Sequence, residues 1–123
     1  MTVDITLAPK RKRDAGEVCD RPLVWPEVTA EQAGRLAAVA RALADPVRVQ
    51  LMDVLANHAG EVCVCELVPL FDLGQPTISH HLKVLRDSGL VGVQRRGIWA
   101  YYHVLEGALE ELRSWLPAPR GRP

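Results

Sequence analysis

Residues 74–104 read GQPTISHHLKVLRDSGLVGVQRRGIWAYYHV, and this stretch decides the fold. Its first half carries apolar residues at helical spacing, namely Ile78, Leu82 and Leu85. We therefore expect a helix that starts at Gln75, has Pro76 in its first turn and is ended by Gly89. The second half alternates, is rich in Val, Trp and Tyr, and has Arg96 and Gly97 at its centre. That pattern predicts a β-hairpin with a basic turn.

Four further helices are expected around this stretch, over residues 29–44, 46–57, 64–71 and 105–116. Thr29 is a suitable N-cap for the first of them. Asp45 followed by Pro46 supplies an N-cap and a proline at the first helical position of the second. The resulting order is helix, helix, short helix, helix, hairpin, helix. It predicts an α+β fold, mostly helical, of the winged helix-turn-helix type.

The chain has 123 residues, 48% of them hydrophobic and 24% charged, which fits one compact domain. We expect a mobile N-terminal tail over residues 1–24, a DNA-binding and dimerisation domain over 25–117, and a C-terminal tail over 118–123. The apolar runs are too short to cross a membrane, and the N-terminus lacks the order of a secretory signal. A cytoplasmic protein is expected. No phosphate loop, GxSxG or HExxH motif is present, so we expect neither an enzyme nor an organic cofactor.

The whole chain has no net charge, but residues 75–97 carry four basic side chains and one acidic one. This local surplus fits a polyanionic partner, and double-stranded DNA suits a helix whose outward face carries short hydrogen-bonding groups and a cation. An ordinary solvated face is the alternative. The expected DNA-binding residues are Gln75, Thr77, Ser79, His80, Lys83 and Arg86 on the helix and Arg95 and Arg96 on the hairpin. His81 is interpreted as a partly buried structural residue, and Trp99, Tyr101 and Tyr102 as packing residues.

Cys63 and Cys65 stand two residues apart at the mouth of the expected short helix. Side chains at this spacing in a regular helix point about 200° apart, so both thiols can hold one ion only where the helix is extended, frayed or distorted. We therefore predict that a thiophilic ion deforms this helix and moves the following one out of register with DNA. Two alternatives remain open. The cysteines are small core residues, or they sense oxidation.

The runs ALADPVRVQLMDVL, VCVCELV, GQPTISHHLKVLRDSGLV and RRGIWAYYHV together resemble the ArsR/SmtB family of bacterial metal-responsive transcriptional repressors, in particular its arsenic-responsive members. The resemblance covers about residues 33–116. It implies a homodimeric winged helix-turn-helix that occupies an operator and leaves it when a metal ion binds. By position it carries operator contacts to Gln75, Ser79 and His80, and wing contacts to Arg95 and Arg96. Gly74 departs from the family, which usually has serine there.

The resemblance also implies a third thiolate. Arsenic-responsive relatives often carry a cysteine where this chain has Val68, whereas cadmium- and lead-sensing relatives use one in the N-terminal tail of the opposite subunit. Cys19 is then the expected third ligand beside Cys63 and Cys65. Three sulfurs suit As(III) or Sb(III), with Cd(II) or Pb(II) as the alternative. His58 could lend a nitrogen instead. The last helix lacks the histidine of zinc-sensing relatives, so a second site is not expected.

Two apolar stripes predict how the chain assembles. The first expected helix contributes Leu36, Val39 and Leu43, and the last contributes Leu105, Leu109, Leu112 and Leu116. Together they offer more apolar surface than one small domain can cover, so we expect a homodimer held by these two helices. Its two recognition helices would address half-sites of an inverted repeat about one helical turn apart.

Overall fold

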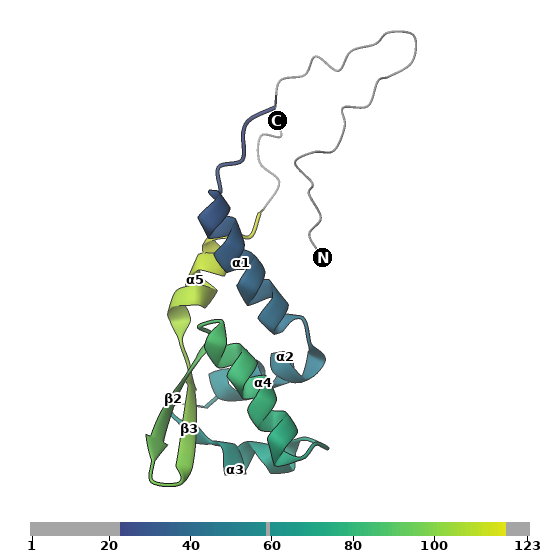
Figure 1. The fold of residues 1–123 in the computed structure, drawn as a ribbon, viewed down its shortest axis with the longest axis vertical. Helices are drawn as coiled ribbons and strands as arrows, with labels where there is room; N and C mark the ends of the chain where they lie inside the picture. The colour runs from purple at the N-terminus through teal and green to yellow at the C-terminus, as the bar shows by residue number, and fades with distance from the viewer. Residues whose placement is uncertain (1–22, 59, 118–123) are drawn as a thin grey trace, which may run out of the picture.

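The computed structural model describes residues 23–58 and 60–117. Along these residues the elements are α1 (Ala30–Leu43), α2 (Pro46–Ala56), β1 (Val62–Cys63), α3 (Val64–Leu67), the short 3-10 helix η3 (Val68–Leu70), α4 (Gln75–Asp87), β2 (Val91–Arg96), β3 (Trp99–Val104) and α5 (Glu106–Trp115). Helices α1 and α5 lie side by side at one end of the molecule, and α3, the start of α4 and the hairpin lie at the other (Figure 1). This is the predicted winged helix-turn-helix.

The first two helices begin where their caps predict. The Thr29 hydroxyl accepts a hydrogen bond from the backbone N–H of Gln32 at 3.1 Å, and the Gln32 side chain accepts one from the N–H of Thr29 at 2.9 Å. Asp45 accepts from the N–H of Val47 at 2.8 Å, with Pro46 at the first helical position. These contacts satisfy N–H groups that have no partner inside a helix, so the two helix starts are fixed locally.

The core confirms the apolar face predicted for α4. Ile78, Leu82 and Leu85 are fully buried, and they belong to one cluster with Leu51 of α2 and Leu67 of α3. Because this cluster also receives Val39 and Ala42 of α1, the orientation of α4 depends on how α1, α2 and α3 pack beneath it. The polar face of α4 is thereby turned outward.

The sheet has three antiparallel strands in the order β1-β3-β2. Strand β1 was not expected from the sequence, because two residues are too short to show alternation. It pairs Val62 with Tyr102 and Cys63 with Tyr101. The short helix expected over 64–71 is also divided, since α3 ends at Leu67 and η3 follows with Pro69 inside it. Proline has no N–H for the next helical hydrogen bond, which explains the change of helix type.

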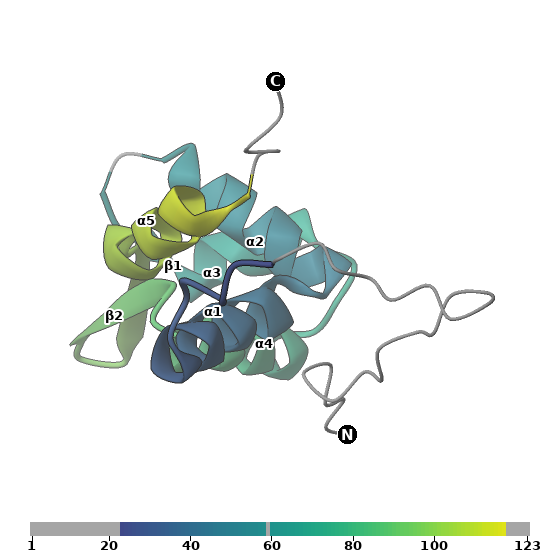
Figure 2. The same cartoon turned by 90° about the horizontal axis from the view of Figure 1, so that it is seen from above.

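Helices α1 and α5 are adjacent in both side and top views (Figures 1 and 2), and Arg35 Nε lies 3.0 Å from Glu111 Oε1 between them. Leu36 and Val39 are buried by the chain itself, so this part of the expected dimer surface is already covered. The apolar residues that stay exposed on or beside α5 are Leu105, Trp115 and Leu116. No helix among the described residues has the length and apolar character needed to cross a membrane.

Candidate functional site

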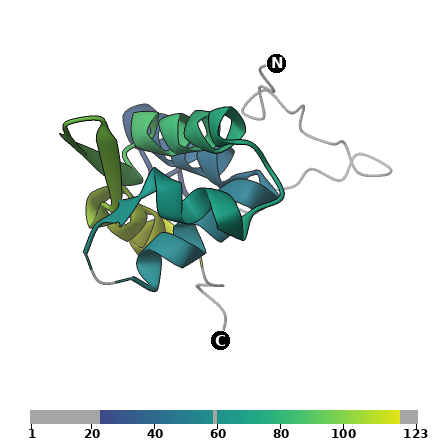
Figure 3. The same ribbon diagram turned by 90° about the horizontal axis from the view of Figure 1, so that it is seen from below.

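Helix α4 presents the polar side chains that the sequence predicted. Gln75, Thr77, His80 and Lys83 are exposed, while Ser79 and Arg86 are half-buried. The start of α4 and the hairpin turn flank α3 at the same end of the molecule, and both are in view from that end (Figures 1 and 3). The helix also begins without a side-chain cap, because Gly74 occupies that position. Its first N–H groups therefore remain available to an acceptor such as phosphate oxygen.

The cations of α4 have an acidic neighbour. Lys83 Nζ lies 3.0 Å from Asp87 Oδ2, and Arg86 Nε lies 3.9 Å from Asp87 Oδ1. The hydrogen bond from Lys83 lowers the pKa of the Asp87 carboxyl, which stays charged at neutral pH. Asp87 therefore offsets one of the two positive charges. Both cations remain solvent-accessible, so a phosphate can compete with Asp87 for them.

His81 has the structural position that its place beside the apolar face predicted. It is half-buried, and its Nδ1 lies 3.2 Å from Arg48 Nη1. The Arg48 side chain is only 15% exposed, and it also donates to the backbone carbonyls of Ala42 and Arg41 at the end of α1. This cluster ties α1, α2 and α4 together beneath the outward face of α4.

The two hairpin arginines lie on opposite faces of the sheet, because side chains alternate along a strand. Arg95 pairs with the buried Ala100, is exposed, and has no ion-pair partner among the described residues. Arg96 pairs with Trp99, and its Nη2 lies 2.5 Å from Glu61 Oε1. Arg95 is therefore free to reach a polyanion, whereas Arg96 is already engaged within the chain.

The aromatic residues of β3 differ in exposure. Tyr102 is buried and Tyr101 is half-buried, with the Arg96 guanidinium carbon 4.8 Å from its ring centroid. Trp99, for which the sequence predicted packing in the core and the wing, is 48% exposed beside Ile98, itself 88% exposed, so it does not belong to the core. The cause is the position of both residues at the turn, where Gly97 with φ of +62° reverses the chain beyond the core.

Cys63 and Cys65 lie with their sulfur atoms 2.7 Å apart. The sequence required an extended, frayed or distorted segment for both thiols to hold one ion, and this condition is met because Cys63 is extended. The conflict expected for two thiols on a regular helix is therefore absent. Cys63 ends β1 with extended backbone and caps α3, whereas Cys65 lies in the first turn of that helix. The change of backbone conformation between them turns both side chains toward one point. No deformation is needed to bring the two sulfurs together.

The surroundings of the two thiols differ. Cys63 is 3% exposed, and Cys65 is exposed. The Cys63 N–H donates to Glu66 Oε1 at 3.0 Å, and the Cys65 N–H points at Cys63 Sγ at 3.4 Å. The hydrogen bond from the Cys65 thiol to Cys63, together with partial burial, raises the pKa of Cys65. Cys65 is thus the accessible member of the pair, and its thiol keeps its proton at neutral pH.

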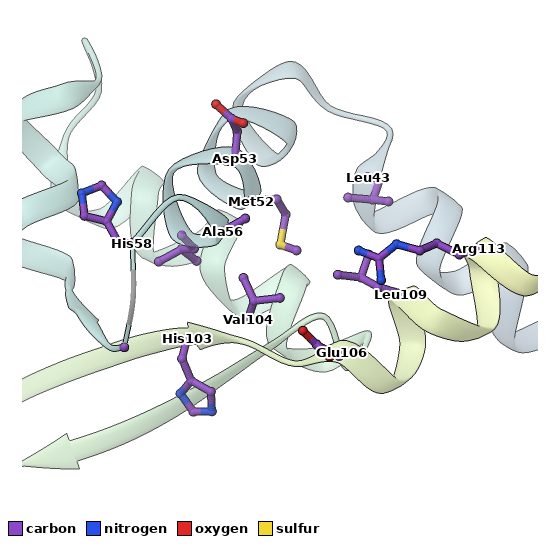
Figure 4. Close-up of a pocket in the computed structure, with 12 residues that line it drawn as sticks. Leu43, Met52, Asp53, Ala56, His58, His103, Val104, Glu106, Leu109 and Arg113 are labelled. Atoms are coloured by element: carbon purple, nitrogen blue, oxygen red, sulfur yellow. The ribbon is translucent and has the colours of Figure 1, made fainter.

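Among the described residues, no third ligand lies beside the two thiols. Cys19 lies outside the described residues. His58 follows the end of α2 and lines a cavity between α2, β3 and α5 (Figure 4). His103 of β3 and Glu106 of α5 line the same cavity. His58 Nδ1 lies 2.7 Å from the Val54 carbonyl. Within residues 23–58 and 60–117 no three Cys, His, Asp or Glu side chains are grouped to hold a metal ion.

Glu61 is the site residue that sequence reasoning missed. It lies just before β1, its side chain is 24% exposed, and it holds Arg96 of the hairpin. The only clue in the sequence is an acidic residue placed two positions before Cys63, which has no meaning until β1 is known to pair with β3.

A model of the family described as "Bacterial regulatory protein, arsR family" matches residues 45–93, from the cap of α2 into β2. An uncharacterized HTH-type transcriptional regulator of Methanocaldococcus jannaschii is 33% identical over 82 residues, which are 67% of this chain and 91% of the relative. The arsenic resistance transcriptional regulator ArsR1 of Pseudomonas putida is 37% identical over 89 residues, covering 63% of this chain and 69% of the relative.

A solved structure shows the same fold. It is the solution structure of a homodimeric winged helix-turn-helix DNA-binding domain from Mycobacterium bovis, 30% identical with a TM-score of 0.58. The match covers 73% of this chain and 79% of that one.

Proposed function

Because this chain belongs to the ArsR family of bacterial regulatory proteins and is a DNA-binding transcriptional repressor, not an enzyme, we propose that As(III) or Sb(III) bound by its cysteines releases it from its operator. The observation that carries this proposal is the 2.7 Å separation of Cys63 and Cys65 sulfurs. Two thiols directed at one point favour a soft, thiophilic ion over hard cations such as Mg²⁺ or Ca²⁺.

The third donor in this proposal is Cys19. Residues 1–24, the tail expected from the sequence, would precede a DNA-binding and dimerisation domain over residues 25–117. The tail of one subunit would bring Cys19 to Cys63 and Cys65 of the other. Exposure of Cys65 supports this arrangement, because a ligand arriving from outside the domain can reach its sulfur. Three sulfurs match the pyramidal coordination of arsenite and antimonite, and Cd(II) or Pb(II) remains the alternative inducer.

The DNA interface in this proposal uses helix α4 and the β2–β3 hairpin. Gln75, Thr77, Ser79 and His80 would meet base edges in the major groove, and Lys83, Arg86, Arg95 and Arg96 would meet phosphates or the minor groove. The outward face of α4 and the position of the hairpin at the same end of the molecule support this assignment. A homodimer would present two such surfaces to an inverted repeat.

The surface for that dimer is smaller than the sequence suggested. Leu36 and Val39 serve the core of the chain itself, so the exposed Leu105, Trp115 and Leu116 at α5 would carry the contact. The homodimeric Mycobacterium bovis domain supports assembly of this kind. Sedimentation at micromolar concentration gives the mass directly, and a stable monomer would refute the dimer.

Thiol oxidation is the second candidate, because two neighbouring sulfurs can also form a disulfide. The raised pKa of Cys65 argues against it, since the thiolate is the form that oxidants attack. A cytosolic location, which is part of our proposal, also keeps thiols reduced. Peroxide that releases DNA from metal-free protein would favour this alternative.

The deciding experiment is a fluorescence-anisotropy titration of reduced protein on a labelled duplex that the protein itself has selected from a random pool. Arsenite should weaken DNA binding by up to about 150-fold, which corresponds to a coupling free energy of about 3 kcal/mol. Cys63→Ser and Cys65→Ser should keep the DNA affinity of the wild type and lose this response. Undiminished release from Cys65→Ser would refute the thiol trigger.

Cys19→Ser tests the tail separately. Loss of the arsenite response in this variant would support a third sulfur from the tail. Undiminished release would show that Cys63 and Cys65 suffice, alone or with His58, and a His58→Ala variant then distinguishes these two cases.

A further inference from the structure

The thiol pair and the hairpin share one sheet. Cys63 is the last residue of β1, and its pairing partner is Tyr101 of β3, the second strand of the hairpin. The backbone that carries Cys63 is therefore hydrogen-bonded to the wing itself. A change in the position of β1 must be taken up by β3 or must break this pairing.

A second connection joins the same elements through side chains. Glu61 and Cys63 are two residues apart on the extended segment that enters β1, and Glu61 Oε1 lies 2.5 Å from Arg96 Nη2. The Arg96 guanidinium also lies 4.8 Å from the ring centroid of Tyr101, and Gln94 Oε1 lies 3.5 Å from Arg96 Nη2. Arg96 is thus held between the residue before the thiol strand and the residue opposite Cys63.

Glu61 depends on this contact. Its second carboxylate oxygen is buried and has no hydrogen-bond partner among the described residues, so Arg96 is the group that compensates the negative charge. The Glu61 side chain is 24% exposed and that of Arg96 is 53% exposed. An ion pair of this exposure is strong enough to bias the direction of a side chain and weak enough to be exchanged for a phosphate.

We propose that Glu61 is a positioning residue for the wing, and that occupancy of the thiol site by an ion weakens DNA binding through the Glu61–Arg96 ion pair as well as through α3. In the ion-free protein Glu61 and Tyr101 hold Arg96 and fix the wing against β1. Two sulfurs bound to one ion through bonds of about 2.3 Å lie about 3.3 Å or more apart, so an ion held by Cys63 and Cys65 must part the sulfurs that now lie 2.7 Å apart. Cys63 carries this movement into β1, which shifts relative to β3, so the ion pair is strained or lost and the wing leaves its position. This inference rests on the proposed function.

The test compares DNA affinity with and without sodium arsenite in Glu61→Gln, Arg96→Gln and the double variant. The measured quantity is the factor by which arsenite weakens DNA binding. We expect this factor to fall by up to about fivefold in Glu61→Gln, the range open to an ion pair of this exposure, since the cation–π contact of Arg96 with Tyr101 stays in place. The double variant should show the same factor as Arg96→Gln alone, because Glu61 acts through Arg96.

Glu111→Gln is the matched control. It removes an ion pair of similar exposure, that with Arg35, which touches neither the sulfurs nor the hairpin. Its arsenite factor should equal that of the wild type. Ultraviolet absorption from sulfur–arsenic bonds should be unchanged in Glu61→Gln, which shows that the ion still binds and that only its effect on DNA is reduced.

The outcomes separate the two proposals. A wild type that binds no arsenite, or that stays on DNA when it does, refutes the proposed function. If arsenite releases the wild type from DNA and weakens DNA binding by the same factor in Glu61→Gln as in Glu111→Gln, only the role of Glu61 is refuted. If Glu61→Gln does not fold, an unchanged factor in Arg96→Gln refutes that role instead, because Arg96 is exposed at the hairpin end.

Discussion

The protonation of Cys65 predicts how inducer strength depends on pH. At neutral pH the Cys65 thiol keeps its proton, because its hydrogen bond to Cys63 and its partial burial raise its pKa. A divalent ion such as Cd(II) must displace that proton, so one proton is released for each thiol that becomes a thiolate ligand. Arsenous acid, As(OH)₃, instead loses one hydroxyl group for each thiol and forms water. Its binding therefore releases no net proton.

The magnitude follows from this count. Displacement of one proton makes the apparent affinity rise tenfold per pH unit, about 1.4 kcal/mol, at pH values below the thiol pKa. Between about pH 6 and about pH 8, cadmium should therefore become at least roughly 100-fold more effective at releasing DNA. Arsenite should change by less than about twofold over the same range, since its exchange of hydroxyl for sulfur is proton-neutral.

Anisotropy titrations of protein bound to labelled operator, made with cadmium and with arsenite at several pH values, measure how the effectiveness of each ion changes with pH. DNA affinity without ion must be recorded at each pH, so that any pH dependence of DNA binding itself is separated from that of ion binding. Cys65→Ser should remove the contribution of that thiol to the cadmium slope. A cadmium midpoint that does not move with pH would show that Cys65 is already a thiolate, and the account of the thiol pair given above would be wrong.

Three further predictions follow from the interface and the fold. Arg95→Ala should lower the slope of log affinity against log salt by roughly one unit, and Arg96→Ala should lower it less because Glu61 already pairs with Arg96. His80→Ala should cost about 1–3 kcal/mol on the selected operator and leave affinity for unrelated DNA unchanged, as competition titrations would show. Asp45→Asn should keep the cap of α2 and reduce the loss of stability on acidification, measured by urea unfolding at about pH 7 and about pH 3.

The direction of the Asp45 effect comes from its pKa. Partial burial alone would raise that pKa, but the N–H groups of Arg48 and Val47 and the charges of His81 and Arg48 together lower it below its ordinary value. A carboxylate whose pKa is lowered by folding stabilises the folded protein at pH values above the pKa that the group has in the unfolded chain. That stabilisation is lost as the pH falls through the folded pKa. Equal acid sensitivity of Asp45→Asn and the wild type would contradict this assignment.

The features that sequence reasoning found are those fixed by neighbouring residues. The spacing of Ile78, Leu82 and Leu85 places one face of α4 in the core, whatever lies across from it. Thr29 and Asp45 satisfy N–H groups two or three residues away, so their helices begin where the sequence predicts. In each case the deciding spacing or contact lies within about two helical turns, which a linear pattern records.

The features that it missed depend on residues far apart in the chain. Strand β1 exists because Val62 and Cys63 meet β3, about forty positions later, and two residues carry no periodicity of their own. The expectation that the thiols diverge followed from treating both as helical. Pairing with β3 instead makes Cys63 extended, and this single change brings the sulfurs together. The Glu61–Arg96 ion pair has the same origin.

Cys63 is therefore connected to both candidate DNA-contacting elements, the β2–β3 hairpin and helix α4. Its strand pairing with Tyr101 leads to the hairpin, and its capping of α3, through Glu66, leads to Leu67, which packs in the same buried cluster as Ile78 of α4. A ligand that fixes the Cys63 sulfur acts on the last residue of a strand and on the cap of a helix at once. Because close-packed cores transmit small displacements instead of absorbing them, a modest shift at this residue can reach the hairpin and α4 together.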